Sequence, residues 1–443
     1  MDVQEMLRQK TISIEEAVAK IGTGAYVYTY GPGEPVAFLK KMSYLKESGR
    51  ENVSIVNVLN VMPYEYYTEE SYRGVINNIS LFFSGTCAGG QKTGRIAFAP
   101  NHLRNSIADR MYYHERTGRP VSVYIVSASP MDRHGFFSTG LVGMSNQTLI
   151  RKADIVMLEI NDKVPRTFGD SMVHISQVDY LFEGHSGVPC LPSREADEVE
   201  QRIGENIADL IEDGSTIQLG IGGIPNAVAA SLRDKKNLGV FTEMMNDGIM
   251  HLYKDGVVTN TENTLYPGRM VTAFSFGSQE LYDFLDDNPG VLHLAVERTN
   301  NPSVIAQNRK MVSVNTTLQI DLMGQCASEA IGTRQISGTG GQSEFAIGAK
   351  ASPGGKSIVA LPSTAMIKGK DGSRRRISKI LPVHGEGTVL SLLRADTDYV
   401  VTEYGVAALR GATMRERAEE LIAVAHPDYR DELRSEARKR YIL

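Results

Sequence analysis

Residues 17–39, AVAKIGTGAYVYTYGPGEPVAFL, recur in altered form at residues 207–229, IADLIEDGSTIQLGIGGIPNAVA. When the two stretches are aligned without a gap, three turn-forming positions coincide: Gly24 with Gly214, Gly33 with Gly223, and Pro35 with Pro225. Each copy reads as a helix, a turn, an apolar strand, a glycine loop and a second helix, which is typical of α/β proteins with parallel sheets. We therefore predict two related open α/β domains with mainly parallel sheets, and an active-site cleft between them.

Apolar runs with a period of two alternate with helical patterns along the rest of the chain. Strands are predicted at 25–30, 53–59, 121–128, 154–161, 216–221 and 399–405, and helices include 13–21, 193–214 and 415–425. The stretch EGHSGVPCLPSREADE, which begins at Glu183, holds glycines and prolines just before a helix start and marks a domain boundary. We expect an N-terminal domain over 1–188 and a C-terminal domain over 193–443.

The composition excludes several classes of protein. The chain has 443 residues, of which 42% are hydrophobic and 22% charged, as in globular proteins, and its net charge of −5 predicts neither nucleic acid nor a membrane as partner. The start, MDVQEMLRQK, lacks the apolar segment of a secretory signal, so we expect a cytoplasmic protein. The histidines show no metal-ligand spacing, and Cys87, Cys190 and Cys326 are expected as buried or half-buried thiols. We expect no metal.

The second glycine loop, GIGGIPNAV (220–228), follows a strand, and its glycines allow a ligand to approach the backbone closely. The next helix would offer its free N–H groups to an anion or an oxyanion. A tight turn that binds nothing is the alternative, and the first copy, which carries Glu34 in its loop, fits that case. A dinucleotide site is another alternative, because Glu243 follows the loop at about 20 residues. Against it, Pro225 stands where the third glycine of that motif belongs.

Glu243 lies in FTEMMNDG (241–248), at the end of an apolar run. The cluster SGTGGQSEF (337–345) predicts a flexible hairpin when taken alone. The basic run KGKDGSRRRISK (368–379) predicts a solvated loop, and the alternative is that it attracts a phosphate-bearing cofactor. None of these motifs is decisive alone, and only their combination in the second half of the chain is specific.

GIGGIPNAV, FTEMMNDG, NTTLQIDLMGQ (315–325), SGTGGQSEF and DYVVTEYGVAALRG (398–411), in this order, resemble the acetyl-CoA hydrolase/transferase family. The likeness covers essentially the whole chain and is greatest to the 4-hydroxybutyrate CoA-transferases. It implies that Glu243 is the nucleophile and that Asn315 lines the pocket. It further implies that coenzyme A and its thioester are bordered by Gly220, Ile221, Gly222, Gly223, Ile224 and Gly341.

The resemblance implies a ping-pong reaction in which a glutamyl carboxylate takes up coenzyme A from an acyl-CoA and passes it to a short-chain carboxylic acid. Backbone N–H groups of the glycine loops would stabilise each oxyanion. Coenzyme A travels as a substrate, so no bound cofactor is expected, and the implied assembly is a homodimer or homotetramer. A dry, unpaired Glu243 carboxylate would be the better nucleophile, and Met244 and Met245 would either provide its apolar flank or be ordinary core residues. An acyl-CoA hydrolase, in which water takes up the acyl group, is the nearest alternative.

Two segments depart from the family pattern. Glu386-Gly387 aligns where a His-Gly pair is expected, with His384-Gly385 displaced, and SGTCAGGQKTGRIAF (84–98) differs from the arginine-bearing counterpart of the 4-hydroxybutyrate enzymes. These departures leave the acid substrate open and do not concern the nucleophile.

Overall fold

The computed structural model describes residues 2–118, 123–192, 194–369 and 372–443. Residues 121–122 of one predicted strand, Ser193 at the predicted boundary and residues 370–371 of the basic run lie outside these ranges. The chain forms two compact units: unit 1 comprises residues 1–192, 271–299 and 336–340, and unit 2 comprises 193–270, 300–335 and 341–443. This division differs from the predicted continuous domains, because two later segments make their contacts within unit 1.

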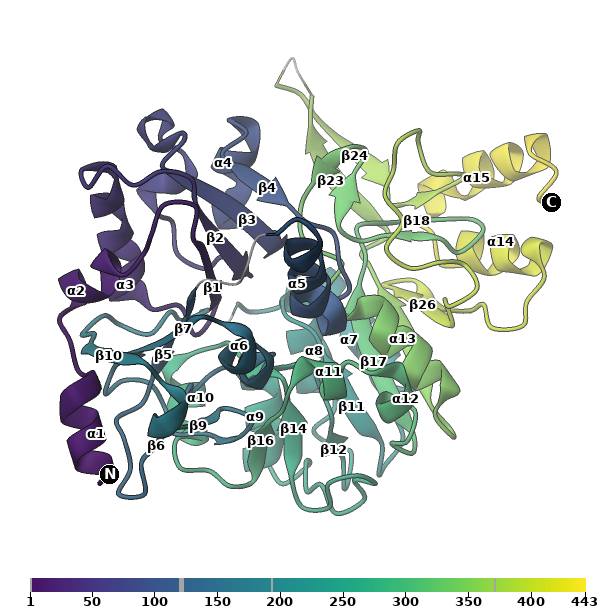
Figure 1. The fold of residues 1–443 in the computed structure, drawn as a ribbon. Helices are drawn as coiled ribbons and strands as arrows, with labels where there is room; N and C mark the ends of the chain where they lie inside the picture. Colours follow the sequence, from purple (N-terminus) through teal and green to yellow (C-terminus); the bar gives the residue numbers. More distant parts are fainter. Residues whose placement is uncertain (1, 119–122, 193, 370–371) are drawn as a thin grey trace. The chain divides into compact units, whose positions relative to one another are not determined.

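Unit 1 is built on a seven-stranded sheet in the order β10-β7-β5-β1-β2-β3-β4, in which neighbouring strands pair in parallel (Figure 1). Its strands are β1 (Tyr26–Tyr30), β2 (Val53–Val58), β3 (Ile76–Phe82), β4 (Ile96–Phe98), β5 (Val123–Ala128), β7 (Ile155–Ile160) and β10 (Tyr180–Glu183). Strands of a parallel sheet are covered on both faces and are therefore apolar along their length. Accordingly, β1, β2 and β5 are buried at every position.

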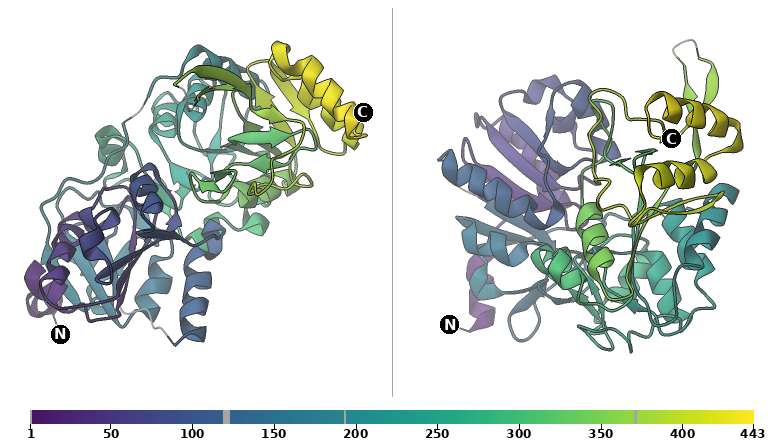
Figure 2. Two further views of the ribbon diagram at one scale, coloured as in Figure 1. Left: turned by 90° about the horizontal axis from the view of Figure 1, so that it is seen from above. Right: turned by 90° about the vertical axis from the view of Figure 1, so that its right-hand side faces the viewer.

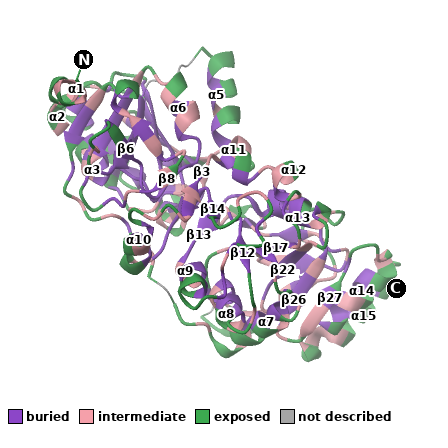
Figure 3. Ribbon diagram, turned by 90° about the horizontal axis from the view of Figure 1, so that it is seen from below, coloured by how far each residue is buried: buried purple, intermediate pink, exposed green. Residues whose placement is uncertain are grey.

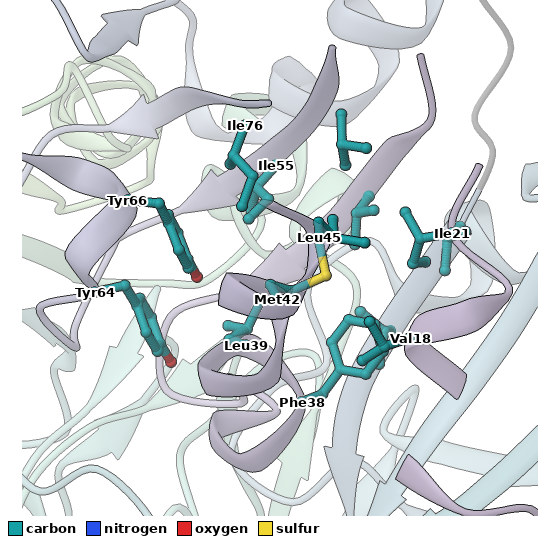
Figure 4. Close-up of a cluster of buried hydrophobic side chains, with 14 of the residues drawn as sticks. Val18, Ile21, Phe38, Leu39, Met42, Leu45, Ile55, Tyr64, Tyr66 and Ile76 are labelled. Atoms are coloured by element: carbon teal, nitrogen blue, oxygen red, sulfur yellow. The ribbon is translucent and has the colours of Figure 1, made fainter. Parts of the chain in front are cut away.

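The helices of unit 1 are α1 (Val3–Lys10), α2 (Ile14–Ala19), α3 (Val36–Lys41), α4 (Ala88–Lys92), α5 (Ser106–Arg116), α6 (Asn146–Lys152), α10 (Gln279–Leu285) and α11 (Val296–Thr299). Short strands are β6 (Phe136–Ser138), β8 (Phe168–Gly169), β9 (Met172–His174), β15 (Phe274–Ser275) and β16 (Val291–His293), and β14 (Met270–Thr272) lies where the chain passes from unit 2 to unit 1. Figure 4 shows the core in which Phe38, Leu39 and Met42 pack with Ile55 and Ile76, all buried.

Unit 2 is built on a six-stranded sheet in the order β12-β11-β17-β22-β26-β27, in which only the last pair, β26 and β27, is antiparallel. Its strands are β11 (Thr216–Leu219), β12 (Gly239–Val240), β17 (Met311–Thr316), β22 (Lys356–Ala360), β26 (Tyr399–Thr402) and β27 (Gly405–Ala408). The interior of this sheet is buried along β12, β17 and β22 (Figure 3). Both sheets confirm the predicted α/β class with mainly parallel strands.

The helices of unit 2 are α7 (Glu198–Ala208), α8 (Gly223–Ser231), α9 (Asp247–Lys254), α12 (Pro302–Ile305), α13 (Gln342–Ala351), α14 (Met414–Ala423) and α15 (Pro427–Lys439). Short strands are β13 (Met244–Met245), β18 (Gln319–Asp321), β19 (Cys326–Ala327), β20 (Ala330–Ile331), β21 (Arg334–Gln335), β23 (Thr364–Lys368), β24 (Arg374–Ser378) and β25 (Ile380–Leu381). Helices α14 and α15, yellow in Figure 2, pack against each other and bury Leu421 and Leu433 in the core of unit 2.

The sequence repeat is present in both units as the same local structure. Gly24 (φ 76°) and Gly214 (φ 73°) both adopt the left-handed conformation just before the strand. The N–H of Gly24 donates to the Glu51 carbonyl and that of Gly214 to the Lys236 carbonyl, so each turn is tied to the loop before the neighbouring strand. Strand β1 leads to α3 and strand β11 leads to α8, as the aligned stretches predict.

Three local predictions are corrected. The run at 399–405 is not one strand, because β26 ends at Thr402 and the chain turns at Glu403 and Tyr404 into antiparallel β27. The basic run includes strand β24, which pairs with β23 and carries exposed Arg374 and Arg375. Cys190 is exposed, whereas Cys87 and Cys326 are buried as expected. Over the described ranges, we find no helix with both the length and the apolar character that crossing a membrane requires.

Candidate active site

Glu243 follows directly from the sheet of unit 2. Strand β12 pairs in parallel with β11, and the N–H of Phe241 continues this ladder by donating to the Ile217 carbonyl. The chain then bends at Thr242, whose buried hydroxyl donates to the Met244 carbonyl at 3.0 Å. Glu243 therefore leaves the carboxyl edge of the sheet, the edge at which open α/β proteins bind their ligands.

The Glu243 residue is half-buried, and its carboxyl is held by hydrogen bonds. Nδ2 of Asn300 donates to its Oε2 at 2.6 Å, and the N–H of Gly341 also donates to the carboxyl. Met244 and Met245 are buried, as both an apolar flank of Glu243 and ordinary core residues would be. The expectation of an unpaired carboxylate is wrong, because a buried charge without donors would be strongly destabilising and two donors supply that need here.

The glycine cluster at 337–345 forms the start of a helix and not the hairpin that it predicts when taken alone. Gly341 is the N-cap residue of α13. A Cβ atom at position 341 would overlap both the Glu243 carboxylate and the Asn300 amide, so only glycine fits there. The helix also directs the positive end of its dipole at the carboxylate.

Two influences act on the protonation of Glu243. Burial raises the pKa of its carboxyl to about 7, while the hydrogen bonds from Asn300 and from the N–H of Gly341 favour the charged form and lower the pKa in part. The carboxyl is thereby ionisable near neutral pH and less hydrated than a surface glutamate. Both properties suit a nucleophile.

The loop at 220–224 connects β11 to α8 and lies beside the Glu243 segment. Gly222 has φ 110°, and open space lies where its side chain would stand, so a ligand can approach this backbone closely. Gly223 has no such space, because a Cβ there would overlap Glu200 and Arg194. Nδ2 of Asn246 donates to the Gly220 carbonyl at 2.8 Å and ties the loop to FTEMMNDG. Ile224 is buried, whereas Ile221 is 46% exposed.

The two copies of the glycine loop differ in what occupies the helix N-terminus. In unit 1, the buried carboxylate of Glu159 on β7 accepts the N–H groups of Ala37 and Phe38 and so caps α3 from within. Glu34 is also buried and accepts hydrogen bonds from Asn57 and Tyr64. The N-cap residue of α8 is Gly222, which has no side chain to cap the helix. The first copy is filled by Glu159 and Glu34, whereas the second copy has Glu200 beside Gly223 and open space at Gly222.

Asn315 lies at the same edge of the sheet, one residue before the end of β17. Its Nδ2 donates to Oε1 of Gln218 on β11 at 3.1 Å. β11 lies between β17 and β12, so Asn315 and the Glu243 segment flank one central strand. Gln342 donates to the carbonyl of Thr316 at 3.1 Å and joins the start of α13 to this strand.

Models of known families match both ends of the chain. The acetyl-CoA hydrolase/transferase N-terminal domain matches residues 1–192, and the C-terminal domain of the same family matches residues 277–437. The chain belongs to the acetyl-CoA hydrolase/transferase family. The family match agrees with the order of motifs along the sequence.

Three proteins of known name or structure are similar to this chain over its whole length. A 4-hydroxybutyrate coenzyme A transferase of Clostridium kluyveri is 40% identical over 100% of both chains. A butyryl-CoA:acetate CoA-transferase of Anaerostipes caccae is 34% identical over 100% of this chain and 99% of its own. The crystal structure of RipA from Yersinia pestis superposes with a TM-score of 0.90 at 34% identity over 100% of both chains. In contrast, an acetyl-CoA hydrolase of Kluyveromyces lactis is 27% identical over 76% of this chain and 70% of its own.

Two residues beside Glu243, Asn300 and Glu344, were not predicted as site residues from the sequence. Asn300 stands one residue before Asn301, which caps α12 by accepting the N–H of Ser303. Asn300-Asn301 is therefore typical of a helix start. The local sequence does not show that Asn301 caps the helix while Asn300 binds a carboxylate that is distant along the chain. Glu344 lies in the first turn of α13, where acidic residues are common for electrostatic reasons alone.

Proposed function

We infer that this protein is a CoA-transferase that moves coenzyme A between an acyl-CoA and a short-chain carboxylic acid, with Glu243 as its nucleophile. The observation that carries the proposal is the Glu243 carboxyl itself. It stands at the carboxyl edge of the sheet, receives hydrogen bonds from Asn300 and Gly341, and has a pKa raised to about 7.

The proposed reaction consists of four successive nucleophilic attacks. The Glu243 carboxylate attacks the thioester carbonyl, and the C–S electron pair leaves with the CoA thiolate, so that an acyl-glutamyl anhydride remains. The thiolate then attacks the glutamyl carbonyl and releases the first acid as its carboxylate. An incoming carboxylate attacks the resulting glutamyl-CoA thioester, and the freed thiolate finally attacks the acyl carbonyl of the new anhydride. Glu243 is regenerated as a carboxylate, which makes the kinetics ping-pong.

Coenzyme A is proposed to lie along the loop at 220–224, with Gly341 and Asn315 at the same edge of the sheet. The open space at Gly222 supports this, because the backbone there is accessible to a ligand. The exposed Ile221 offers an apolar surface to the same ligand. Binding at a site remote from the reacting carbonyl supplies free energy that can be used in the transition state.

The transferase is favoured over a hydrolase by the comparisons, since the transferases match the whole chain at higher identity than the acetyl-CoA hydrolase does. A dinucleotide site is disfavoured by Pro225, which lies in the first turn of α8 where that fingerprint needs a glycine. We propose acetate, butyrate or 4-hydroxybutyrate as the class of acid. The Glu386 side chain is exposed, so its departure from the family pattern does not place a carboxylate in a buried pocket. A cytoplasmic location and a homodimer or homotetramer remain part of this proposal.

The test is intact mass spectrometry after the protein is incubated with acetyl-CoA or butyryl-CoA and no acceptor acid. We expect a CoA adduct on the peptide that contains Glu243, loss of the adduct when acetate is added, and no adduct in Glu243→Ala. Asp234→Ala, at an exposed position away from the site, is the matched control and should form the adduct normally. Steady release of CoA without any adduct, independent of added acid, would instead indicate hydrolysis.

A further inference from the structure

Two carboxyl groups from separate segments of unit 2 converge on one amide nitrogen. Nδ2 of Asn300 lies 2.6 Å from Oε2 of Glu243 and 3.3 Å from Oε2 of Glu344. The Asn300 side chain is fully buried and Glu344 is 4% exposed. Burying a carboxylate costs free energy unless hydrogen-bond donors or opposite charges compensate for the lost water. The burial of Glu344 therefore calls for a structural or functional explanation.

The arrangement determines which way the Asn300 amide points. An asparagine amide donates through Nδ2 and accepts through Oδ1. If the amide were turned over, Oδ1 would face the carboxylate oxygens of Glu243 and Glu344, and neither contact would be a hydrogen bond. During the proposed reaction, however, Glu243 becomes a neutral anhydride and then a neutral thioester. Glu344 is the acceptor that still holds the nitrogen in place at those stages.

The contact also distinguishes the two oxygens of Glu243. Oε2 accepts the hydrogen bond from Asn300, so an attack through Oε1 leaves that contact in place. If Oε1 forms the bond to the acyl carbon, Oε2 remains as the glutamyl carbonyl oxygen. When the CoA thiolate adds to that carbon, the C=O electron pair moves onto Oε2, directly opposite Nδ2 of Asn300. When the adduct collapses, Oε1 leaves with the released acid.

The surrounding helices hold this geometry. Helix α12 follows Asn300 and packs closely on α13, because Gly348 of α13 leaves room for Ile305, whose side chain a Cβ at 348 would overlap. Glu344 is the third residue of α13 and lies in its first turn. The close approach of the two helices therefore brings Asn300 and Glu344 within hydrogen-bond distance.

We propose that Asn300 is the side-chain oxyanion donor to Oε2 of Glu243, and that Glu344 is the positioning residue that keeps its nitrogen turned towards that oxygen. This inference rests on the proposed function, since it assigns roles within the glutamyl-CoA reaction.

The experiment measures the rate of CoA-adduct formation on Glu243 at saturating acyl-CoA, with the half-saturating concentration and thermal unfolding recorded for each variant. Glu344→Gln keeps a carbonyl acceptor of the same reach, whereas Glu344→Met removes it at similar volume. We expect Glu344→Gln to stay within about threefold of the wild type and Glu344→Met to lose on the order of 10²-fold in rate, the cost of one misplaced oxyanion donor. The half-saturating concentration should not change.

A double-mutant cycle with Asn300→Ala tests whether Glu344 acts by positioning Asn300 or only by supporting the folded structure. If Glu344 acts through Asn300, adding Glu344→Met to Asn300→Ala should slow the adduct no further. Equal losses in Glu344→Gln and Glu344→Met, full additivity in the cycle, or no loss in Glu344→Met would each overturn the inference while the proposed function stands. Absence of an adduct in the wild type would overturn the proposed function and this inference with it.

Discussion

At the scale of single residues, the proposed chemistry depends on the pKa of the Glu243 carboxyl, which burial raises and hydrogen bonds lower. Burial raises the pKa of Glu243 to about 7, against donors that favour its charged form. A carboxylate with this pKa is about half ionised at neutral pH, so small changes in its surroundings alter the amount of nucleophile directly.

The first prediction concerns pH. Because only ionised Glu243 attacks, the rate of adduct formation at sub-saturating butyryl-CoA should rise through about pH 7 and level off above it. Single-turnover measurements between about pH 5.5 and about pH 8.5 would record the midpoint. A rate that stayed constant over this range, as expected for an ordinary glutamate with a pKa of about 4.3, would contradict the raised pKa.

The second prediction concerns Gly341. Glycine is required there because a Cβ would overlap the Glu243 carboxylate and the Asn300 amide. Gly341→Ala should therefore abolish adduct formation, with a loss of about 10²-fold or more in rate. Gly22→Ala is the control, because Gly22 has open space around its Cβ position and no positive φ. If Gly341→Ala formed the adduct as fast as Gly22→Ala does, the close contact would be irrelevant to the reaction.

At the scale of elements, the strand–glycine loop–helix unit occurs twice and serves two purposes. In unit 1, Glu159 from β7 fills the N-terminus of α3, and the loop there is structural. In unit 2, Gly222 adopts φ 110° next to open space, and the loop is tied to the nucleophile segment through Asn246. The same local design is thus closed by a side chain in one unit and accessible in the other.

The third prediction separates strain from binding in this loop. Gly222→Ala introduces strain of about 1–3 kcal/mol, because φ 110° is unfavourable for alanine, and it also places a methyl group in the proposed ligand space. Gly256 (φ 76°) likewise has open space but lies after α9, away from the loop. Both alanine variants should lower the unfolding temperature, and only Gly222→Ala should raise the half-saturating acyl-CoA concentration. Equal half-saturation in the two variants would exclude the loop from binding.

At the scale of the whole molecule, stability depends on buried carboxyl groups as well as on the apolar cores. Two of them lie in the described part of unit 1, where burial raises the pKa of Glu34 to about 8 and that of Glu159 to about 7. Each is hydrogen-bonded within the sheet and its loops, so these groups connect strands and helices that are distant in sequence. Because their folded-state pKa values exceed those of unfolded glutamate, they couple the unfolding of unit 1 to pH.

The fourth prediction follows from Glu34. A raised folded-state pKa means that the contribution of this carboxyl to stability is complete below about pH 4 and is lost as the pH rises through about 8. Glu34→Gln removes the ionisation and retains a carbonyl acceptor for Asn57. Thermal unfolding should show the wild type losing stability relative to Glu34→Gln between about pH 5 and about pH 9. A constant difference over that range would show that Glu34 titrates normally.

Several features were predictable because their physical causes are local. The strands at 26–30, 53–58 and 155–160 follow from apolar periodicity, and Gly24 and Gly214 adopt positive φ in the turns that the repeat predicts. The hairpin at 399–408 and the helix after Gly341 were missed, since a short run of residues does not reveal where a ladder reverses or what a loop packs against. The division into units could not be predicted from the sequence, because residues 271–299 pack with unit 1 although the preceding residues, 193–270, belong to unit 2.

The sequence by itself determined the α/β class, the repeated glycine loop and the place of Glu243 within an ordered set of motifs. The tertiary structure alone decided that the carboxyl is hydrogen-bonded, that Asn300 and Glu344 stand beside it, and that one glycine loop is capped by Glu159 while the other is open. Propensity and periodicity act between neighbours along the chain, so they appear in the sequence. Burial and hydrogen bonds between distant segments exist only after the sheets and helices have packed, and they determine the pKa of the carboxyl.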